Sequence, residues 1–127
     1  MPPKILIADD EAYIRLLLVQ TLEEIEEQGV DLLTAEDGQA ALDLIRTQAP
    51  DLVFLDVMMP CMNGFEVCRA ARALEPREPA PYIVILTAKG QEYDRKQGEE
   101  SGADLFMTKP FDPDAVIALA ARVLGRS

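Results

Sequence analysis

Five short runs of apolar residues punctuate the 127-residue chain, and longer segments with helical spacing separate them. The clearest run covers 52–55 and ends at Asp56, with Pro50 before it and Pro60 after it. An apolar run of this length between prolines predicts a buried strand rather than a helix. The other runs cover 4–8, 30–35, 82–86 and 103–107. We therefore predict five short, mostly buried strands.

Each segment between and after these strands predicts a helix. The first helical pattern ends at Gly29, the second stops before Pro50, and the last begins with a cap at Asp112 followed by Pro113. The helix predicted over 91–101 is unusually polar. Strands joined through helices run parallel, with right-handed crossovers. We predict an α/β fold, namely a flavodoxin-like, doubly wound (βα)5 arrangement with a five-stranded parallel sheet in the order 2-1-3-4-5.

Composition narrows the class of protein. A chain of this length predicts a single domain over residues 1–127. The net charge of −11 disfavours direct nucleic-acid binding, which requires a basic surface. The absence of histidine excludes a histidine base or a phosphohistidine on this chain. No apolar run approaches the ~20 residues that span a bilayer, and the N-terminus lacks a signal-peptide pattern, so we expect a cytoplasmic protein with reduced Cys61 and Cys68.

Polar residues stand at the ends of four predicted strands: Asp9 and Asp10, Asp56, Thr87, and Lys109. In a parallel sheet these ends open on one edge, and the first and third strands lie astride the predicted switch point, where ligands bind. Taken alone, each residue has an ordinary explanation, such as a helix cap or a surface lysine. Their joint occurrence at four strand ends instead favours a shared site.

The charges of this site predict a divalent cation. Carboxylates ~4–6 Å apart at an effective dielectric near 20 repel by roughly 3–4 kcal/mol per pair. Lys109 supplies one positive charge for three acids. The ligands on offer are all oxygen atoms, so we expect Mg²⁺, with Mn²⁺ as a substitute, rather than zinc. Asp56 is then a natural nucleophile for a phosphoryl group, with Lys109 pairing with one phosphoryl oxygen and the Thr87 hydroxyl donating to another.

Six segments give the chain a resemblance to a known family. They are IADDE at 7–11, DLVFLDVMMP at 51–60, NG at 63–64, LTA at 86–88, GAD at 102–104 and TKPF at 108–111. With these residues at these spacings, the chain resembles the receiver domain of the two-component response regulators. The resemblance covers essentially the whole chain.

The resemblance implies a role for each site residue. Asp56 would be the phosphoacceptor and, with Asp10, a direct Mg²⁺ ligand; the backbone carbonyl of Met58 would be a third ligand, and Asp9 would act through water. Lys109 would contact the phosphoryl group, and so would the backbone of Ala88. Thr87 would supply the switch hydroxyl, and Phe106 would be the aromatic residue that moves with it. The Lys109–Pro110 peptide bond would be cis.

The family also implies partners. The donor would be a phosphohistidine on a sensor histidine kinase or phosphotransfer protein, and the output would be a downstream target or a missing output domain of the same protein. The switching face would comprise the helix over 91–101, the last strand and the last helix, which could also form a homodimer. We expect a stand-alone regulator or a receiver excised from a longer protein, without nucleic-acid binding or membrane insertion of its own.

Two other classes of function stay open. An Mg²⁺-dependent aspartyl-phosphate phosphatase should carry a second acid two residues after its nucleophile, where this chain has Met58. A flavodoxin-like small-ligand module needs a phosphate-cradling loop after the first strand, where 9–11 instead carry three acids. We therefore expect a regulatory domain that assists only its own phosphotransfer and dephosphorylation, and not an enzyme.

Overall fold

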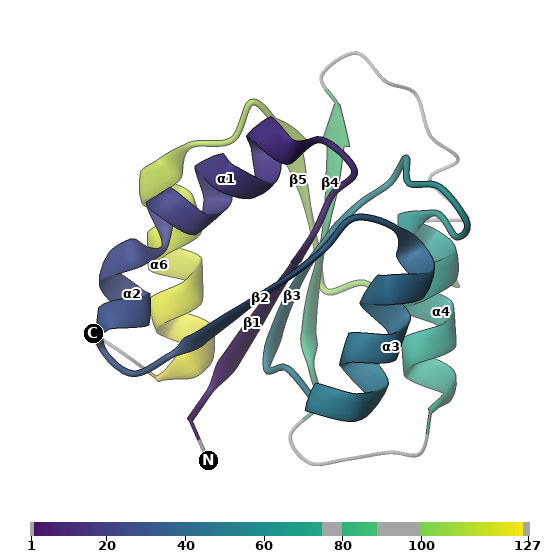
Figure 1. Ribbon diagram of the computed structural model, residues 1–127, viewed down its shortest axis with the longest axis horizontal. Helices are drawn as coiled ribbons and strands as arrows, with labels where there is room; N and C mark the ends of the chain where they lie inside the picture. The colour runs from purple at the N-terminus through teal and green to yellow at the C-terminus, as the bar shows by residue number, and fades with distance from the viewer. Residues whose placement is uncertain (1, 75–79, 89–99, 126–127) are drawn as a thin grey trace.

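The computed structural model describes residues 2–74, 80–88 and 100–125. Five parallel strands form one sheet in the order β2-β1-β3-β4-β5, which confirms the predicted order (Figure 1). The strands are β1 (Lys4–Ala8), β2 (Asp31–Ala35), β3 (Leu52–Asp56), β4 (Tyr82–Ala88) and β5 (Leu105–Lys109). Each neighbouring pair is parallel, so all five carboxyl ends open on one edge of the sheet.

Helices cover both faces of the sheet. The described helices are α1 (Ala12–Thr21), α2 (Glu23–Glu27), α3 (Gly38–Gln48), α4 (Gly64–Ala73) and α6 (Pro113–Leu124). In Figure 1, α1, α2 and α6 lie on one side of the strands, and α3 and α4 lie on the other. The helix predicted over 91–101 lies outside the described residues except for its last two positions. None of the helices in the described ranges is long and apolar enough to cross a membrane.

The central strands are buried on both sides because their side chains alternate between two cores. Ile5, Ile7 and Phe54 join the core beneath α1, α2 and α6. Leu6 and Val53 join the core beneath α3 and α4. β3 is buried at every position from Leu52 to Asp56, so a carboxylate ends a wholly apolar run. This pattern explains why continuous apolar runs, without alternation, predict these strands correctly.

The first predicted helix is in fact two helices, α1 and α2, that meet at Leu22. The Thr21 hydroxyl donates a hydrogen bond of 2.7 Å to the carbonyl of Leu17. Threonine hydroxyls bonded back to the preceding turn bend helices, and Leu22 leaves the helical conformation with φ −95° and ψ 10°. The apolar spacing carries on through the break, because Leu18, Leu22 and Ile25 all stay buried.

β4 ends two residues later than predicted, and β5 both begins and ends two residues later than predicted. β4 continues through Thr87 and Ala88, which pair with Thr108 and Lys109 of β5. Asp104, predicted as strand, instead precedes β5, and its carboxylate accepts a hydrogen bond of 2.8 Å from the backbone N–H of Ile83. The apolar residues alone did not reveal this register, because polar residues complete the β4–β5 ladder.

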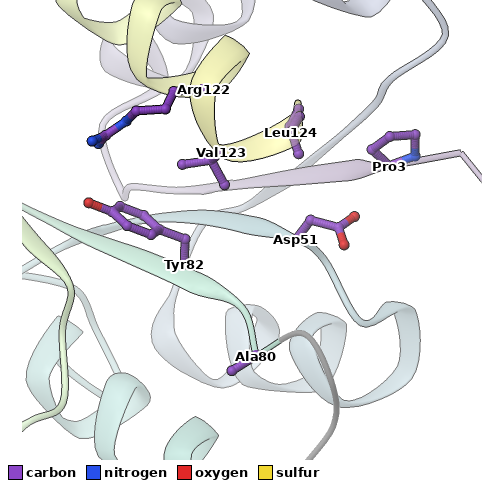
Figure 2. Close-up of a pocket in the computed structure, with 7 residues that line it drawn as sticks. All are labelled: Pro3, Asp51, Ala80, Tyr82, Arg122, Val123 and Leu124. Atoms are coloured by element: carbon purple, nitrogen blue, oxygen red, sulfur yellow. The ribbon is translucent and has the colours of Figure 1, made fainter. Parts of the chain in front are cut away.

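The edge of the sheet at the amino ends of β3 and β4 contains a cavity of about 610 Å³. Figure 2 shows its lining, which comes from the amino ends of β1, β3 and β4 and from the last turn of α6: Pro3, Asp51, Ala80, Tyr82, Arg122, Val123 and Leu124. None of the strand-end residues predicted as a site lines this cavity. The candidate site therefore lies at the other edge of the sheet.

Candidate functional site

Three aspartates meet where β1 and β3 end. Ala8 of β1 pairs with Leu55 of β3, so the residues that follow them, Asp9 and Asp56, lie side by side. Carboxylate oxygens of Asp9, Asp10 and Asp56 all lie within 4.8 Å of one another. Asp9 and Asp56 are buried, whereas Asp10 is exposed. The predicted convergence of the acids is therefore present in the structure.

Lys109 brings a positive charge to these acids from the end of β5. Its Nζ lies 2.7 Å from Asp9 Oδ2 and 3.2 Å from Asp56 Oδ1. The carboxylate of Glu11 lies 3.8 Å from the same nitrogen. Because one ammonium group faces these carboxylates and Asp10 is close by, the described site carries an excess of negative charge.

The remaining predicted residues surround this centre at different depths. Thr87 is buried in β4, one residue beyond Leu86, which pairs with Asp56. Ala88 is exposed at the end of the strand, and Phe106 is partly buried against the core beneath α3 and α4. Met58 is 62% exposed in the loop after β3. The Lys109–Pro110 peptide bond is cis, as the resemblance implied.

A tight turn holds the end of β3. Asn63 caps α4 by accepting a hydrogen bond of 2.9 Å from the Glu66 N–H, and Glu66 accepts one from the Asn63 N–H in return. A Cβ atom on Gly64 would lie 2.5 Å from the backbone oxygen of Asp56. Only glycine therefore lets α4 begin this close to the strand end that carries the carboxylate.

Burial and charge together perturb the central groups. Burial, reinforced by the neighbouring charge of Asp9, raises the pKa of Asp56 to about 6, although Lys109 opposes the shift. Burial alone would lower the pKa of Lys109, but its hydrogen bond to Asp9 and the charge of Asp56 outweigh burial and raise it. The lysine therefore stays charged at neutral pH, and Asp56 loses its proton at a higher pH than an ordinary aspartate does.

Arg15 is a site neighbour that sequence reasoning missed. Its Nη1 donates a hydrogen bond of 2.7 Å to the backbone carbonyl of Asp9, although it lies on α1. One sequence signal could have drawn attention to it: a cation within the first turns of a helix opposes the helix dipole. Such a residue needs compensating partners, and here they are the backbone carbonyl of Asp9 and the carboxylate of Glu36.

The donor set suits a hard divalent cation. The grouped ligand atoms are all carboxylate oxygens, and no histidine exists in the chain. Such oxygens are typical ligands of Mg²⁺, which usually takes only one or two carboxylates and keeps several waters. The exposed position of Asp10 leaves one side of the group open to solvent.

Comparison with known proteins identifies the family. Residues 5–121 match the response regulator receiver domain. The chain belongs to this family. It therefore has a phosphoacceptor signalling role in two-component systems, in which sensor kinases pair with response regulators.

A curated relative of this receiver domain is the alkaline phosphatase synthesis transcriptional regulatory protein PhoP of Bacillus subtilis. The two are 46% identical over 127 residues, which cover 100% of this chain and 50% of PhoP. The receiver domain spans about half the length of the curated relatives it matches, between 46% and 52%.

Solved structures agree with this assignment. The chemotaxis response regulator CheY4 of Vibrio cholerae superimposes with a TM-score of 0.81 at 31% identity, covering 98% of this chain and 100% of CheY4. The BeF3-activated DrrB receiver domain superimposes with a TM-score of 0.79 at 31% identity, covering 99% of this chain and 100% of that domain. The parallel five-stranded fold is thus shared with established receiver domains.

Proposed function

We propose that Asp56 is the residue that accepts the phosphoryl group, within a single receiver domain over residues 1–127. The observation that carries this proposal is the pair of contacts from Lys109 Nζ, 2.7 Å to Asp9 and 3.2 Å to Asp56. These contacts place a positive charge beside a buried carboxylate that ends the central strand. A phosphoryl group on Asp56 would replace the single negative charge of the carboxylate by the larger negative charge of the phosphoryl oxygens. Lys109 would then pair with one of these oxygens.

Mg²⁺ would be held by Asp10, Asp56 and the backbone carbonyl of Met58, with Mn²⁺ as a substitute. The hydrogen bonds of Asp9 support an indirect role for this residue through water. Its Oδ1 accepts from the Glu11 N–H at 2.9 Å, and its Oδ2 accepts from Lys109. When bound, Mg²⁺ would offset the negative charge of the phosphoryl oxygens.

The transfer itself needs positioning more than acid–base chemistry. An Asp56 oxygen attacks phosphorus, an O–P bond forms, and the N–P bond of the donor phosphohistidine breaks. The imidazole keeps the electron pair of that bond and leaves as the neutral ring, because its other nitrogen is protonated. Lys109, the Thr87 hydroxyl and the Ala88 backbone N–H would each contact a phosphoryl oxygen.

The output is proposed to pass through Thr87 and Phe106 to a switching face. Thr87 would move towards the phosphoryl group, and Phe106, which is now partly buried, would turn further inward. The face would combine residues 91–101, β5 and α6, and would bind a downstream target, an output domain or a second copy of the chain. Similarity to the BeF3-activated DrrB domain supports a fold that can be activated by a phosphoryl mimic.

We place this domain in the cytoplasm, with a sensor histidine kinase or phosphotransfer protein as donor and without direct nucleic-acid contacts. Its acidic composition supports the last point. The chain would act as a regulator rather than an enzyme. Met58, which stands where a phosphatase would need a second acid, supports this assignment over the phosphatase alternative.

The first test is phosphorylation with acetyl phosphate and Mg²⁺, followed by intact mass spectrometry. The wild type should gain one phosphoryl group that hydroxylamine removes, as expected for an acyl phosphate. Asp56→Asn should gain none, whereas Asp43→Asn, which changes an exposed acid on α3, should behave as wild type. Equal labelling of Asp56→Asn would refute the assignment, and repeated turnover of p-nitrophenyl phosphate would favour the phosphatase.

A further inference from the structure

Arg15 connects three segments at the carboxyl edge of the sheet. Its side chain is only 16% exposed, although it starts from α1. Nη1 donates to the Asp9 carbonyl at 2.7 Å, and Nη2 donates to Glu36 Oε1 at 3.4 Å. Asp9 follows β1 and Glu36 follows β2, so one guanidinium joins the ends of both strands to the helix.

Arg15 supplies the hydrogen bond to the backbone carbonyl of Asp9. The Asp9 N–H donates to the Ala35 carbonyl at 3.2 Å, which prolongs the β1–β2 ladder by one residue. Its carboxylate accepts from Glu11 and Lys109. The backbone carbonyl lies beyond the strand, and within residues 2–74, 80–88 and 100–125 no backbone N–H donates to it. Because Asp9 is fully buried, that carbonyl would be costly to leave unpaired, and Arg15 satisfies it.

We propose that Arg15 is a positioning residue for the metal site: by holding the Asp9 carbonyl, it fixes the turn that presents Asp10 towards Asp56. In this role Arg15 would act without contacting either the ion or the phosphoryl group. This inference rests on the Mg²⁺ site of the proposed function. Arg15 is not one of the proposed ligands. It would act on the site through the backbone of Asp9.

Charge and positioning predict opposite effects of losing Arg15. A guanidinium near the acids repels an incoming cation, so on charge alone its removal would tighten Mg²⁺ binding. If Arg15 positions the ligands, its removal weakens binding, as the loss of a residue that orients metal ligands typically does. The sign of the change in Mg²⁺ affinity therefore separates the two roles.

The geometry also predicts how lysine would perform at position 15. Arginine spans the two acceptors with donors fixed in one plane, whereas lysine offers a single ammonium group. Arg15→Lys keeps the charge and can reach only one acceptor at a time. The Asp9 carbonyl is the buried acceptor, whereas Glu36 is 79% exposed, so lysine should restore part of the effect and Glu36→Gln should change little.

The experiment is a titration of the full chain with MgCl₂, followed by NMR at constant ionic strength. Arg15→Gln should weaken Mg²⁺ binding roughly ten-fold, and Arg15→Lys should fall between it and wild type. Arg46→Gln makes the same charge change in an exposed pair with Asp43, and it should leave the affinity unchanged. In the metal-free protein, the Glu11 amide should exchange with solvent faster in Arg15→Gln than in Arg46→Gln.

Unchanged or tighter Mg²⁺ binding by Arg15→Gln would overturn the proposal. If that variant does not fold, Arg15→Lys decides the question, and wild-type affinity there would equally overturn it. Wild-type protein without measurable Mg²⁺ affinity would refute the proposed function instead. Exchange of the Glu11 amide in the metal-free protein would then decide by itself whether Arg15 orders the turn.

Discussion

The surroundings of Asp56 favour the protonated form of its carboxyl group. It is buried and faces the charge of Asp9, and together these effects raise its pKa from 3.8 to about 6. The folded protein therefore binds this proton more tightly than the unfolded chain does. In the absence of metal, stability should fall as the pH rises from about 4 towards 6, because the folded state must then lose a proton that it holds strongly.

Asp56→Asn should therefore stabilise the metal-free protein. A shift of this size corresponds to at most about 3 kcal/mol at pH 7.5, because one pKa unit is about 1.4 kcal/mol. Urea unfolding in the presence of EDTA, from pH 4 to pH 8, would measure the gain. It should be largest above pH 6 and close to zero near pH 4, and a gain that does not depend on pH would contradict the assigned cause.

At the scale of elements, Arg72 ties α4 to two other segments. Its guanidinium donates to the carbonyls of Gly102 and Pro81 at 2.9 and 2.8 Å. It also pairs with the carboxylate of Asp104 at 2.7 Å, and that carboxylate accepts from the Ile83 N–H. One side chain thus joins the end of α4 to the start of β4 and to the turn before β5.

Arg72→Met should lower the free energy of unfolding by about 2–3 kcal/mol, since it removes hydrogen bonds from a charged donor and leaves two carbonyls to find other partners. Arg69→Met on the same helix is the matched control, because Arg69 is exposed. Urea unfolding at pH 7 would compare the two variants. Equal losses would mean that the Arg72 contacts contribute little stability.

At the scale of the whole molecule, the net charge of −11 and the acid group act in the same direction. Parallel topology gathers strand ends, and with them carboxylates, on one edge, where their repulsion opposes folding. A cation that binds only the folded chain offsets this repulsion. Stability of the domain is therefore expected to be linked to Mg²⁺.

Mg²⁺ at ten times the dissociation constant of the site should add about 1.4 kcal/mol to the free energy of unfolding. Asp10→Asn should abolish this increment, because Asp10 is a proposed direct ligand of Mg²⁺ and is the exposed member of the acid group. Chemical unfolding with MgCl₂, compared with NaCl of equal ionic strength, separates specific binding from screening. An increment retained by Asp10→Asn would place the cation elsewhere.

The amino-acid sequence by itself determined the sheet and the convergence of the acids. Apolar runs marked β1 and β3, and a parallel arrangement brings the residues after them to one edge whatever the detailed packing. Asp9, Asp10, Asp56 and Lys109 could therefore be predicted as neighbours, although Lys109 is 100 positions from Asp9.

Only the tertiary structure decided the register of β4 with β5 and the contacts of Arg15 and Arg72. Thr87 and Asp104 are polar, so no hydrophobic pattern could place one inside a strand and the other before it. The arginine contacts reach carbonyl groups, which every residue possesses and no side-chain pattern marks. Which carbonyl an arginine contacts depends on how closely its helix lies to the ends of the strands. That distance depends on the packing of the whole chain.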